Sequence, residues 1–526
     1  MNKRVLIIVL CLLTVTLHFG AHAQGGRRDT ITILSYNDFH GAFISGADAA
    51  GADNFIAALM AAKEGAPNPI ILSGGDNFSG SYYSLMSRGE PHQVFTLPIS
   101  SGRVISAVGN HEFDWGGDYL LGTSCEYIDY VGANVTAKRD KKAFKRAVPD
   151  YRIVESGALR IGVIGLTTPT TPFSGKQSYV RDFSFDAEFS SSVNRIARSL
   201  KAKDDVDLVI LLMHIGTSMD GGTPSIDDSD KESERELRRI AGVDAIVSAH
   251  SHKLVRGDFA IANGTDRVPM IQAGNNGTHI GMMQFELYDE QVRCIKNSLI
   301  AVPVPNPQIK QLVDSISNAS GFNEPVVRVT RELIHDRNIN LHEFTDVGAI
   351  VTASYVREYE QSMGRSTVPI IAVNHFKGIR TGISEGELSK AQVGNVLPFG
   401  GNLVAYKMTG AEIRRLFADG MDDSQSRGRL QTCNISFVMS GEEIVSVKWF
   451  DGVDFVEIAD TTECVLLCDD FIAYGGDGYD ADLFKNNRIE DFDIRITTDC
   501  LIKYLREYRE FPNDSYKIPN IDRIGE

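Results

Sequence analysis

Histidine, aspartate and asparagine residues recur at short spacing in the first half of this 526-residue chain. The densest stretch is G-N-H-E-F-D-W-G at 109–116, where Asn110 offers a neutral oxygen ligand and His111 an imidazole, with the carboxylate of Asp114 three residues further on. A carboxylate beside a histidine can fix its tautomer and raise its basicity. Taken alone, the stretch also fits an ordinary turn with a satisfied histidine.

The same residue types follow five predicted strands. Apolar, β-branched runs at 31–35, 103–108, 206–214 and 243–252 are typical of buried strands, and residues 69–80 have the pattern of a further apolar strand that ends in a glycine turn. These strands deliver, in order, Asp38 and His40, Asp76, Asn110 and His111, His214, and His250 and His252. Each strand end has an ordinary explanation by itself, since Asp and His often lie two residues apart by chance. Five successive strand ends favour a shared site, because functional side chains of α/β proteins gather there.

Imidazole and carboxylate ligands together suit Zn, Mn, Fe or Co better than an all-oxygen Mg or Ca site. The candidates are too many for one ion, which favours two ions that share a carboxylate. Two such ions are a common device for hydrolysing phosphate esters. The sequence therefore predicts a dinuclear site for divalent ions and leaves their identity open.

Charge and length restrict the classes of function. The formal net charge of −16 disfavours a nucleic-acid polymer as partner, because neutralising its phosphates needs clustered Lys and Arg. A small phosphorylated substrate, held by metal ions or a local positive site, remains compatible. A chain of this length predicts two domains of roughly 200 to 270 residues each.

Residues 1–23 have the pattern of a secretory signal peptide. Lys3 and Arg4 precede an apolar stretch at 5–19, and Ala21-His22-Ala23 is a small-x-small cleavage site. The alternative is an uncleaved anchor, but the apolar stretch is short and polar residues interrupt it. We expect an exported protein, periplasmic or extracellular, without a membrane anchor.

The motif set D-x-H, G-D-N-x-x-x-S, G-N-H-E-F-D-x-G, a strand-end H and a final H-S-H resembles the calcineurin-like metallophosphoesterase superfamily. More narrowly, it is similar to the secreted 5′-nucleotidase / UDP-sugar hydrolase family, over residues 30–285. The resemblance implies an α/β (α+β) protein with a four-layer αββα metallophosphoesterase sandwich at 28–303. A linker or hinge helix at 304–325 and a separate α/β substrate-binding domain at 326–526 would follow.

The resemblance also assigns roles. One metal would be held by Asp38, His40 and His252, the other by Asn110, His214 and His250, and Asp76 would bridge them. His111 and Asp114 would form the catalytic dyad, and metal-activated water would attack phosphorus. The implied cofactors are two divalent ions, with Zn, Mn, Co or Fe as candidates. One small departure is Ala249, where the family usually has Gly before the final H-x-H.

The second half resembles the family's substrate-binding domain through G-I-R, P-F-G-G and F-x-x-x-G-G-D-G. Arg380 would bind the phosphate, Phe399 and Phe471 would sandwich the base, and Asp477 would bind the ribose hydroxyls. Without the resemblance, the two rings fit core positions and the glycines a turn. Stacking between two rings tolerates different bases.

One departure affects this domain. The family pattern N-x-G-G-I-R is N-H-F-K-G-I-R here, at 374–380. Either Asn374 still reaches the substrate or His375 takes its place, and Lys377 adds a cation near the phosphates. The family's further arginine, expected near residues 343–360, has no clear match.

The leading hypothesis is a phosphohydrolase acting on nucleoside 5′-monophosphates, with nucleoside di- and triphosphates or UDP-sugars as additional substrates, working as a monomer or dimer. The alternative within the superfamily is a 2′,3′-cyclic-nucleotide 2′-phosphodiesterase/3′-nucleotidase. A catalytically silent nucleotide-binding protein is disfavoured by the intact His111 and Asp114. A sulfur-ester hydrolase would leave the two phenylalanines unexplained.

Overall fold

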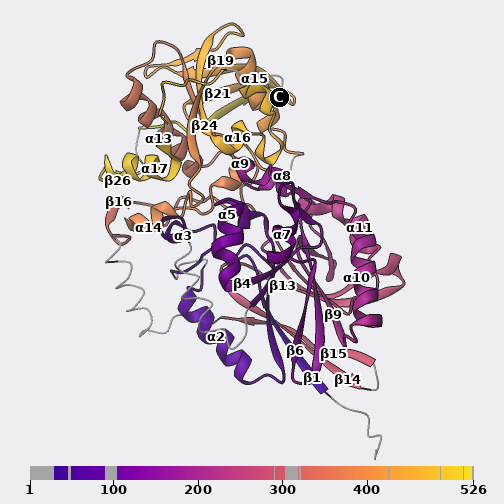
Figure 1. The fold of residues 1–526 in the computed structure, drawn as a ribbon. Coiled ribbons are helices and arrows are strands. Elements are labelled where there is room, and N and C mark those ends of the chain that lie inside the picture. Colours follow the sequence, from indigo (N-terminus) through magenta and orange to yellow (C-terminus); the bar gives the residue numbers. More distant parts are fainter. Residues whose placement is uncertain are drawn as a thin grey trace, which may run out of the picture.

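The computed structural model has two domains, and the N-terminal one lies below the C-terminal one in Figure 1. It describes residues 29–44, 49–88, 104–288, 291–302, 318, 321–424, 427–485, 487–493, 495–512 and 515–523. The expected signal peptide, residues 1–23, and most of the expected linker, residues 304–325, lie outside the described residues.

Two β-sheets form the centre of the N-terminal domain. The six-stranded sheet has the order β15-β14-β1-β2-β3-β4 and contains β1 (Asp29–Tyr36), β2 (Pro69–Ser73), β3 (Val104–Ala107), β4 (Ile128–Val131), β14 (His279–Tyr288) and β15 (Gln291–Ala301). The seven-stranded sheet has the order β12-β13-β11-β9-β7-β6, with β10 beside β9, and contains β6 (Tyr151–Ser156), β7 (Leu159–Thr167), β9 (Leu208–Asp220), β10 (Thr223–Ile226), β11 (Ala245–Ala249), β12 (Leu254–Ile261) and β13 (Asp266–Ala273).

Strands β1 to β4 run parallel to one another, and so do β7, β9, β11 and β13. The carboxyl ends of parallel strands meet at one edge of a sheet, where α/β proteins place their ligands. Each sheet therefore presents the loops that follow its central strands at one common edge.

The apolar run of β9 explains why the two sheets stack. Its odd-numbered residues from Val209 to Met213 pack in a core shared with helix α10 (Ser190–Lys203). Its even-numbered residues from Leu208 to Leu212 pack between the sheets, beside residues of β1 and β3. Alternate side chains of a strand point to opposite faces, so a strand that is covered on both faces is apolar throughout.

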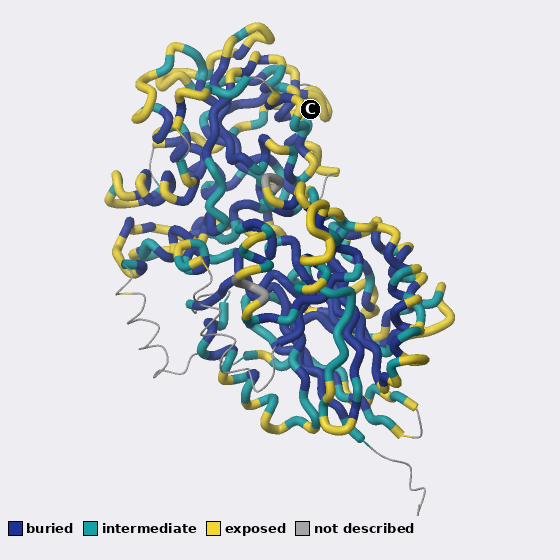
Figure 2. The backbone as a smooth tube through the Cα atoms, viewed as in Figure 1, coloured by how far each residue is buried: buried dark blue, intermediate teal, exposed yellow. Residues whose placement is uncertain are grey.

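Helices cover the outer faces of both sheets. Helix α2 (Ala52–Glu64) buries Phe55 and Leu59 against the six-stranded sheet, and α10 buries Val193 and Leu200 against the seven-stranded one. Figure 2 shows mostly buried strands between these partly exposed helices. The N-terminal domain is thus the four-layer αββα sandwich that the motifs imply.

Shorter elements complete this domain: α3 (Tyr82–Ser87), η1 (Asn110–Phe113), α5 (Gly117–Tyr119), η2 (Leu120–Ser124), α6 (Cys125–Tyr127), β5 (Val135–Ala137), α7 (Lys141–Ala147), α8 (Thr171–Ser174), α9 (Gln177–Val180), β8 (Phe183–Phe185), η3 (Asp228–Ser233), α11 (Glu234–Arg238) and η4 (Ala262–Gly264). Of these, η1 carries the densest motif and begins two residues after Val108. In Figure 1, α8 and α9 lie at the junction with the upper domain.

The C-terminal domain is built on a five-stranded sheet of order β20-β17-β24-β19-β25. Its strands are β17 (Ile370–Asn374), β19 (Asn402–Thr409), β20 (Gln431–Thr432), β24 (Glu463–Asp469) and β25 (Arg495–Ile496). Helices α13 (Asp346–Met363) and α17 (Thr497–Arg506) share a core with one face of this sheet. On the other face lie α15 (Gly410–Gly420) and a sheet of order β23-β22-β21-β27.

The remaining elements of this domain are β16 (Pro325–Val329), η5 (Phe376–Gly378), β18 (Gly386–Ser389), α14 (Lys390–Gly394), β21 (Ile435–Ser440), β22 (Glu443–Phe450), β23 (Phe455–Glu457), α16 (Asp470–Ala473), η6 (Gly476–Gly478), η7 (Ala481–Phe484), β26 (Glu510–Phe511) and β27 (Asn520–Arg523). Three of them, β18, β16 and β26, form a small sheet of their own.

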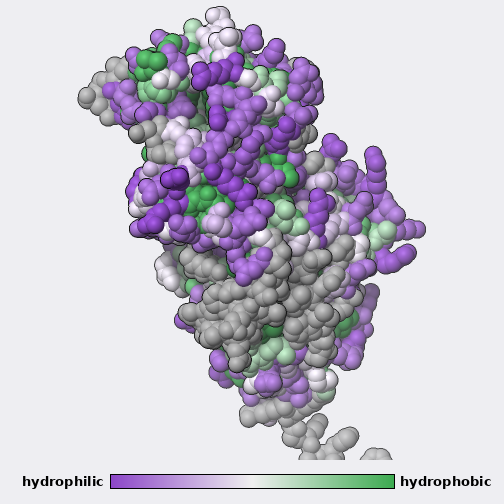
Figure 3. Space-filling model, turned by 90° about the vertical axis from the view of Figure 1, so that its left-hand side faces the viewer, coloured by the Kyte–Doolittle hydropathy of each residue, from purple (hydrophilic) through white to green (hydrophobic). Residues whose placement is uncertain are grey.

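On the face shown in Figure 3, the C-terminal domain is mostly hydrophilic, and its hydrophobic atoms form small separate areas. Among the helices of the described residues, none combines the length and apolar character needed to cross a membrane.

Candidate metal centre and substrate cleft

The predicted ligands come together at the carboxyl ends of the central strands. Asp38 follows β1, Asp76 follows β2 and Asn110 follows β3, while His250 and His252 follow β11. Strands β1, β2 and β3 belong to one sheet and β11 to the other. The site is therefore assembled where the edges of the two sheets meet.

His214 differs from the expectation that it ends a strand. It lies inside β9, which continues to Asp220 and pairs there with β10. The register between β9 and β11 shifts next to it, between Leu212 and Gly216. Such an irregularity re-aims side chains. On the other side of β9, the regular pairing with β7 places His214 opposite Thr167, the last residue of β7.

Five of the predicted ligands share a left-handed backbone. The φ angles of Asp38, His40, Asp76, His250 and His252 are 48°, 51°, 53°, 76° and 61°. Residues other than glycine rarely adopt this conformation, and it persists where the surrounding structure imposes it, most often at functional sites. The turns are therefore held in shapes that aim these side chains inward.

The first ligand group consists of Asp38, His40 and His252, whose ligand atoms all lie within 4.8 Å of one another. The Nε2 atoms of His40 and His252 are 3.0 Å apart. His252 Nε2 lies 3.5 Å from Asp38 Oδ1. Two imidazole nitrogens and a carboxylate oxygen thus converge on one point.

The second group consists of Asp76, His214 and His250. His214 Nε2 lies 3.1 Å from Asp76 Oδ2 and 3.0 Å from the side-chain oxygen of Asn110. His250 Nδ1 lies 3.2 Å from the same His214 nitrogen. Asn110 therefore stands with this group, as the motifs imply.

Asp76 lies between the two groups. Its Oδ2 is 3.1 Å from His214 of the second group and 3.9 Å from His40 Nε2 of the first. Its other oxygen accepts a hydrogen bond of 2.9 Å from the backbone N–H of His111. One carboxylate thus lies near the histidines of both ligand groups.

The chemistry of this donor set fits divalent cations. Burial raises the pKa of Asp38 to about 6 and lowers the pKa of His40 to about 3. For these two residues, burial thus favours the neutral imidazole, which is the form that binds metal, and penalises a carboxylate that lacks a counter-charge. His214 differs, because burial is outweighed by Asp76, which raises the pKa of His214 to about 10. A divalent cation between the ligands would supply the counter-charge for the carboxylates.

Backbone carbonyls orient two of the histidines. His40 Nδ1 lies 2.7 Å from the carbonyl of Ser79, and His214 Nδ1 lies 2.8 Å from that of Gly74. A carbonyl can only accept, so each Nδ1 carries the proton and each Nε2 presents its lone pair to the site.

Glu112 is a supporting residue that the sequence reasoning missed. Its buried carboxylate accepts hydrogen bonds from the backbone N–H groups of Gly109 (2.6 Å), Asp76 (2.9 Å) and Asn77 (2.8 Å). It therefore ties the turn after β2 to the turn after β3. Its position inside the G-N-H-E-F-D motif is the feature of the sequence that could have identified it.

Replacing Glu112 with glutamine is expected to weaken metal binding by roughly 10- to 100-fold, the usual effect of losing a residue that orients metal ligands. A glutamine amide presents one acceptor oxygen and one NH₂ group, so it cannot accept from all three N–H groups. Competition titration with a chromophoric chelator measures the affinity. The exposed Glu126→Gln is the matched control, and equal affinity in both variants would contradict the assigned role.

His111 and Asp114 form a close pair beside the metal ligands. His111 Nδ1 lies 2.7 Å from Asp114 Oδ2. Burial lowers the pKa of His111, but Asp114 and Asp76 outweigh it, so the pKa lies above its ordinary value. Because Asp114 engages Nδ1, the Nε2 atom is the nitrogen that remains for a substrate.

The C-terminal domain supplies the opposite wall of the site. The Phe399 ring stacks on His111, with centroids 4.6 Å apart and an angle of 6° between the planes. The Arg380 guanidinium lies 5.2 Å from the centre of the same ring. Burial and the nearby Arg337 lower the pKa of Arg380 to about 10, so it stays a cation at neutral pH.

Arg337 is a second arginine at the site, and the sequence reasoning did not find it. Its Nη2 lies 3.1 Å from His252 Nδ1. It belongs to a turn before α13 rather than to that helix, where an arginine was sought. No motif marks it, because its contact with His252 joins residues 85 positions apart.

The nucleoside end of the cleft is arranged differently from the expectation. Asn374 is fully buried, and its side-chain oxygen accepts a hydrogen bond of 2.9 Å from the Tyr355 hydroxyl. His375 lines the cleft together with Phe471 and Asp477. Of the two residues considered for contact with substrate, His375 is therefore the one that faces it.

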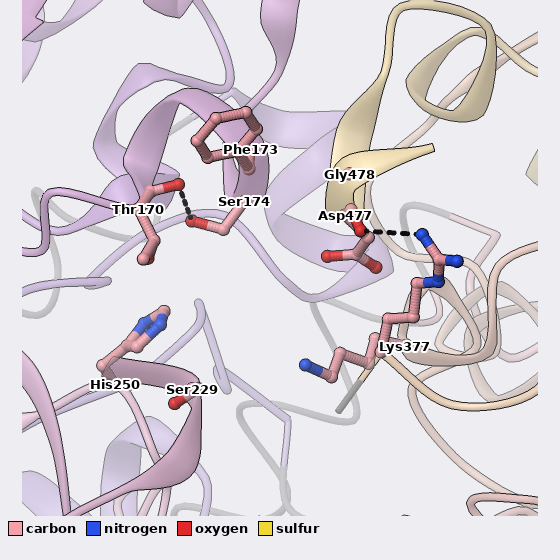
Figure 4. Close-up of a pocket in the computed structure, with 9 residues that line it drawn as sticks. Thr170, Phe173, Ser174, Ser229, His250, Lys377, Asp477 and Gly478 are labelled. Atoms are coloured by element: carbon pink, nitrogen blue, oxygen red, sulfur yellow. Dashed lines mark hydrogen bonds between the residues drawn. The ribbon is translucent and has the colours of Figure 1, made fainter. Parts of the chain in front are cut away.

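Lys377 lines a side pocket of about 300 Å³ that adjoins His250. Figure 4 shows its ammonium group pointing into the cavity, with Phe173 and Ser174 of α8 across from it. Arg427 Nη1 donates a hydrogen bond of 3.3 Å to the Asp477 carbonyl on the same wall. Lys377 thus adds a positive charge beside the second ligand group.

Together these residues line one cleft of about 580 Å³ between the domains. Its N-terminal wall carries four of the predicted ligands, Asp76, Asn110, His250 and His252, and the His111–Asp114 pair, and its C-terminal wall carries the two arginines and the two phenylalanines. Asp38, His40 and His214 do not line the cleft but are buried next to these ligands, and Asn374 is buried in the C-terminal domain.

Two family models match the chain. The calcineurin-like phosphoesterase model matches residues 31–254, and the 5′-nucleotidase C-terminal domain model matches residues 326–484. A Bacillus subtilis relative, trifunctional nucleotide phosphoesterase protein YfkN, is 24% identical over 466 residues. That alignment covers 78% of this chain and 30% of the relative, so this chain spans less than a third of the relative's length.

A 5′-nucleotidase from Vibrio cholerae is 26% identical over 429 residues, which cover 73% of this chain and 74% of that protein. Among solved structures, a 5′-nucleotidase precursor from Thermus thermophilus superimposes with a TM-score of 0.77 at 22% identity, covering 94% of this chain and all of that one. That likeness supports the fold. The chain belongs to the 5′-nucleotidase family of metal-dependent phosphoric monoester hydrolases, in which a 5′-nucleotidase C-terminal domain follows a calcineurin-like phosphoesterase domain.

Proposed function

We propose that this chain is an exported hydrolase that releases phosphate from nucleoside 5′-monophosphates. The cleft between the domains carries this proposal, because two His/Asp groups, two arginines and two aromatic rings lie at it. The proposal extends to nucleoside di- and triphosphates and to UDP-sugars as further substrates.

Asp38, His40 and His252 would hold one divalent ion, and Asn110, His214 and His250 the other, with Asp76 shared. Such ions, when bound, polarise phosphoryl oxygens and lower the pKa of water, so a protein nucleophile is not needed. The protein's own part is to fix the ligands and to orient the phosphate.

His111 and Asp114 would act on the reacting group. Asp114 holds the imidazole through Nδ1, which leaves Nε2 to donate a hydrogen bond to a phosphoryl or leaving-group oxygen. A donor that is fixed in advance stabilises the charge that develops in the transition state. Phe399, parallel to the imidazole, keeps the ring plane in place.

Arg380 and Arg337 would bind the phosphate from the side opposite the metal groups. Both belong to the C-terminal domain, and Arg337 contacts His252 of the N-terminal domain. The phosphate would thus be held from both domains. We propose domains at 28–303 and 326–526 that close on the substrate about a hinge at 304–325.

Export is proposed from the charged, apolar and small-x-small pattern of residues 1–23.

Phosphate release by the purified chain, stripped of metal and reloaded with Zn, Mn, Co or Mg, tests the proposal. The substrates are AMP, ADP, UDP-glucose, 3′-AMP, 2′,3′-cyclic AMP and p-nitrophenyl phosphate. We expect metal-dependent release that is fastest from AMP and absent after chelation. Release mainly from the cyclic and 3′ substrates would instead show a 2′,3′-cyclic-nucleotide phosphodiesterase, and inactivity with every metal would show a binding protein.

A further inference from the structure

His375 stands between two carboxylates and an aromatic ring at the nucleoside end of the cleft. Its Nε2 lies 3.3 Å from Asp469 Oδ2, and its Nδ1 lies 3.3 Å from Asp477 Oδ2. Its ring stacks on Phe471, with centroids 4.4 Å apart and an angle of 25° between the planes. Both ring nitrogens and one face of Phe471 are therefore already engaged within the protein.

The surroundings of His375 fit its ring closely. A Cβ added at Gly378 would overlap the imidazole, so the glycine leaves the space that the ring fills. Only 12% of the His375 side chain is exposed, and the two carboxylates are similarly covered. Gly476 also lies against Phe471, because a Cβ there would overlap the phenyl ring.

Charge strengthens this arrangement. Burial opposes a charged imidazole, but Asp469 and Asp477 outweigh it and raise the pKa of His375 to about 9. At neutral pH a cation therefore pairs with both carboxylates and lies on an aromatic face, where cations are attracted. A base or ribose that took these positions would first have to break both ion pairs.

We propose that His375 is a specificity-determining residue that withholds the Phe471 face and the Asp477 carboxylate from the nucleoside. This inference rests on the proposed function. It assigns the chain to substrates that are recognised mainly through phosphate and sugar, with a small contribution from the base. Sugar 5-phosphates such as ribose 5-phosphate are then hydrolysed about as well as nucleoside 5′-monophosphates.

The test compares kcat/KM for AMP and for ribose 5-phosphate, which differ by the base. His375→Asn retains a donor for one carboxylate, and Phe471→Ala removes the ring. In the native chain we expect Phe471→Ala to change the AMP-to-ribose-5-phosphate ratio by less than about threefold. His375→Asn frees the ring and is expected to raise the ratio at least about fivefold, within the range of one base-stacking contact.

The double variant decides between a direct and an indirect effect. If His375 acts by covering Phe471, the rise disappears when Phe471→Ala is added to His375→Asn. A ratio that falls fivefold or more in Phe471→Ala alone, or that does not rise in His375→Asn, overturns the proposal. His375→Ala repeats the test if circular dichroism shows that the asparagine variant is unfolded.

Adenosine binding to the metal-free chain gives a readout that does not need turnover. By titration calorimetry, His375→Asn should bind adenosine at least about fivefold more tightly than the native chain, and Phe471→Ala should equal the native chain. Equal binding by all three overturns the inference. Loss of phosphate release from every substrate, with this binding pattern intact, would contradict the proposed function alone.

Discussion

The substitution His111→Ala is expected to lower kcat for AMP by roughly 10²- to 10⁴-fold, which is the range for losing a positioned proton donor. KM should change little, because the proposed phosphate contacts of Arg337, Arg380 and the metal groups would remain. The reason is geometric: Asp114 engages His111 Nδ1 at 2.7 Å, so the imidazole presents Nε2 to the cleft. Steady-state kinetics of the metal-loaded chain measure both constants.

His342→Ala is the control for this change. That histidine is partly exposed outside the cleft and pairs with Asp423 at 3.3 Å, so its removal should leave kcat unchanged. Asp114→Asn should lower kcat in the same direction as His111→Ala. A fully active His111→Ala enzyme with normal metal content would refute the dyad.

Asp76→Asn is expected to lower kcat by about 10³-fold or more and to reduce the bound metal from two ions toward one. The Asp76 carboxylate lies near the histidines of both ligand groups, 3.1 Å from His214 and 3.9 Å from His40. An amide has nearly the same shape but lacks the negative charge that two cations share. Metal content after dialysis, measured by atomic emission, checks the stoichiometry.

The matched control is Asp118→Asn, an exposed aspartate on α5. It should retain both ions and full activity. Two tightly bound ions in Asp76→Asn would show that the bridging role belongs to another residue.

Much of the N-terminal site could be predicted from the sequence because its signals are local. Asp38, Asp76 and Asn110 each follow a buried strand within three residues, and parallel strands bring such positions to one edge. The αββα sandwich and the family were predicted from the same motifs, and both are confirmed. The individual ligand and dyad roles remain predictions.

Other features depend on contacts between distant segments. Asn374 and His375 are neighbours in sequence, but Tyr355 of α13 holds the first in the core, and Asp469 and Asp477 hold the second in the cleft. The motif N-H-F-K-G-I-R could not decide between them, because the partners lie 19 or more residues away.

Strand pattern and turn chemistry are local properties of the chain, so the residue types that follow each strand could be predicted from the amino-acid order alone. The folded arrangement was needed to show that His214 lies inside β9, that Arg337 contacts His252, and that His375 stacks on Phe471. These outcomes depend on register shifts and on packing between domains. Such contacts are set by the free energy of the whole fold, which short sequence motifs do not encode.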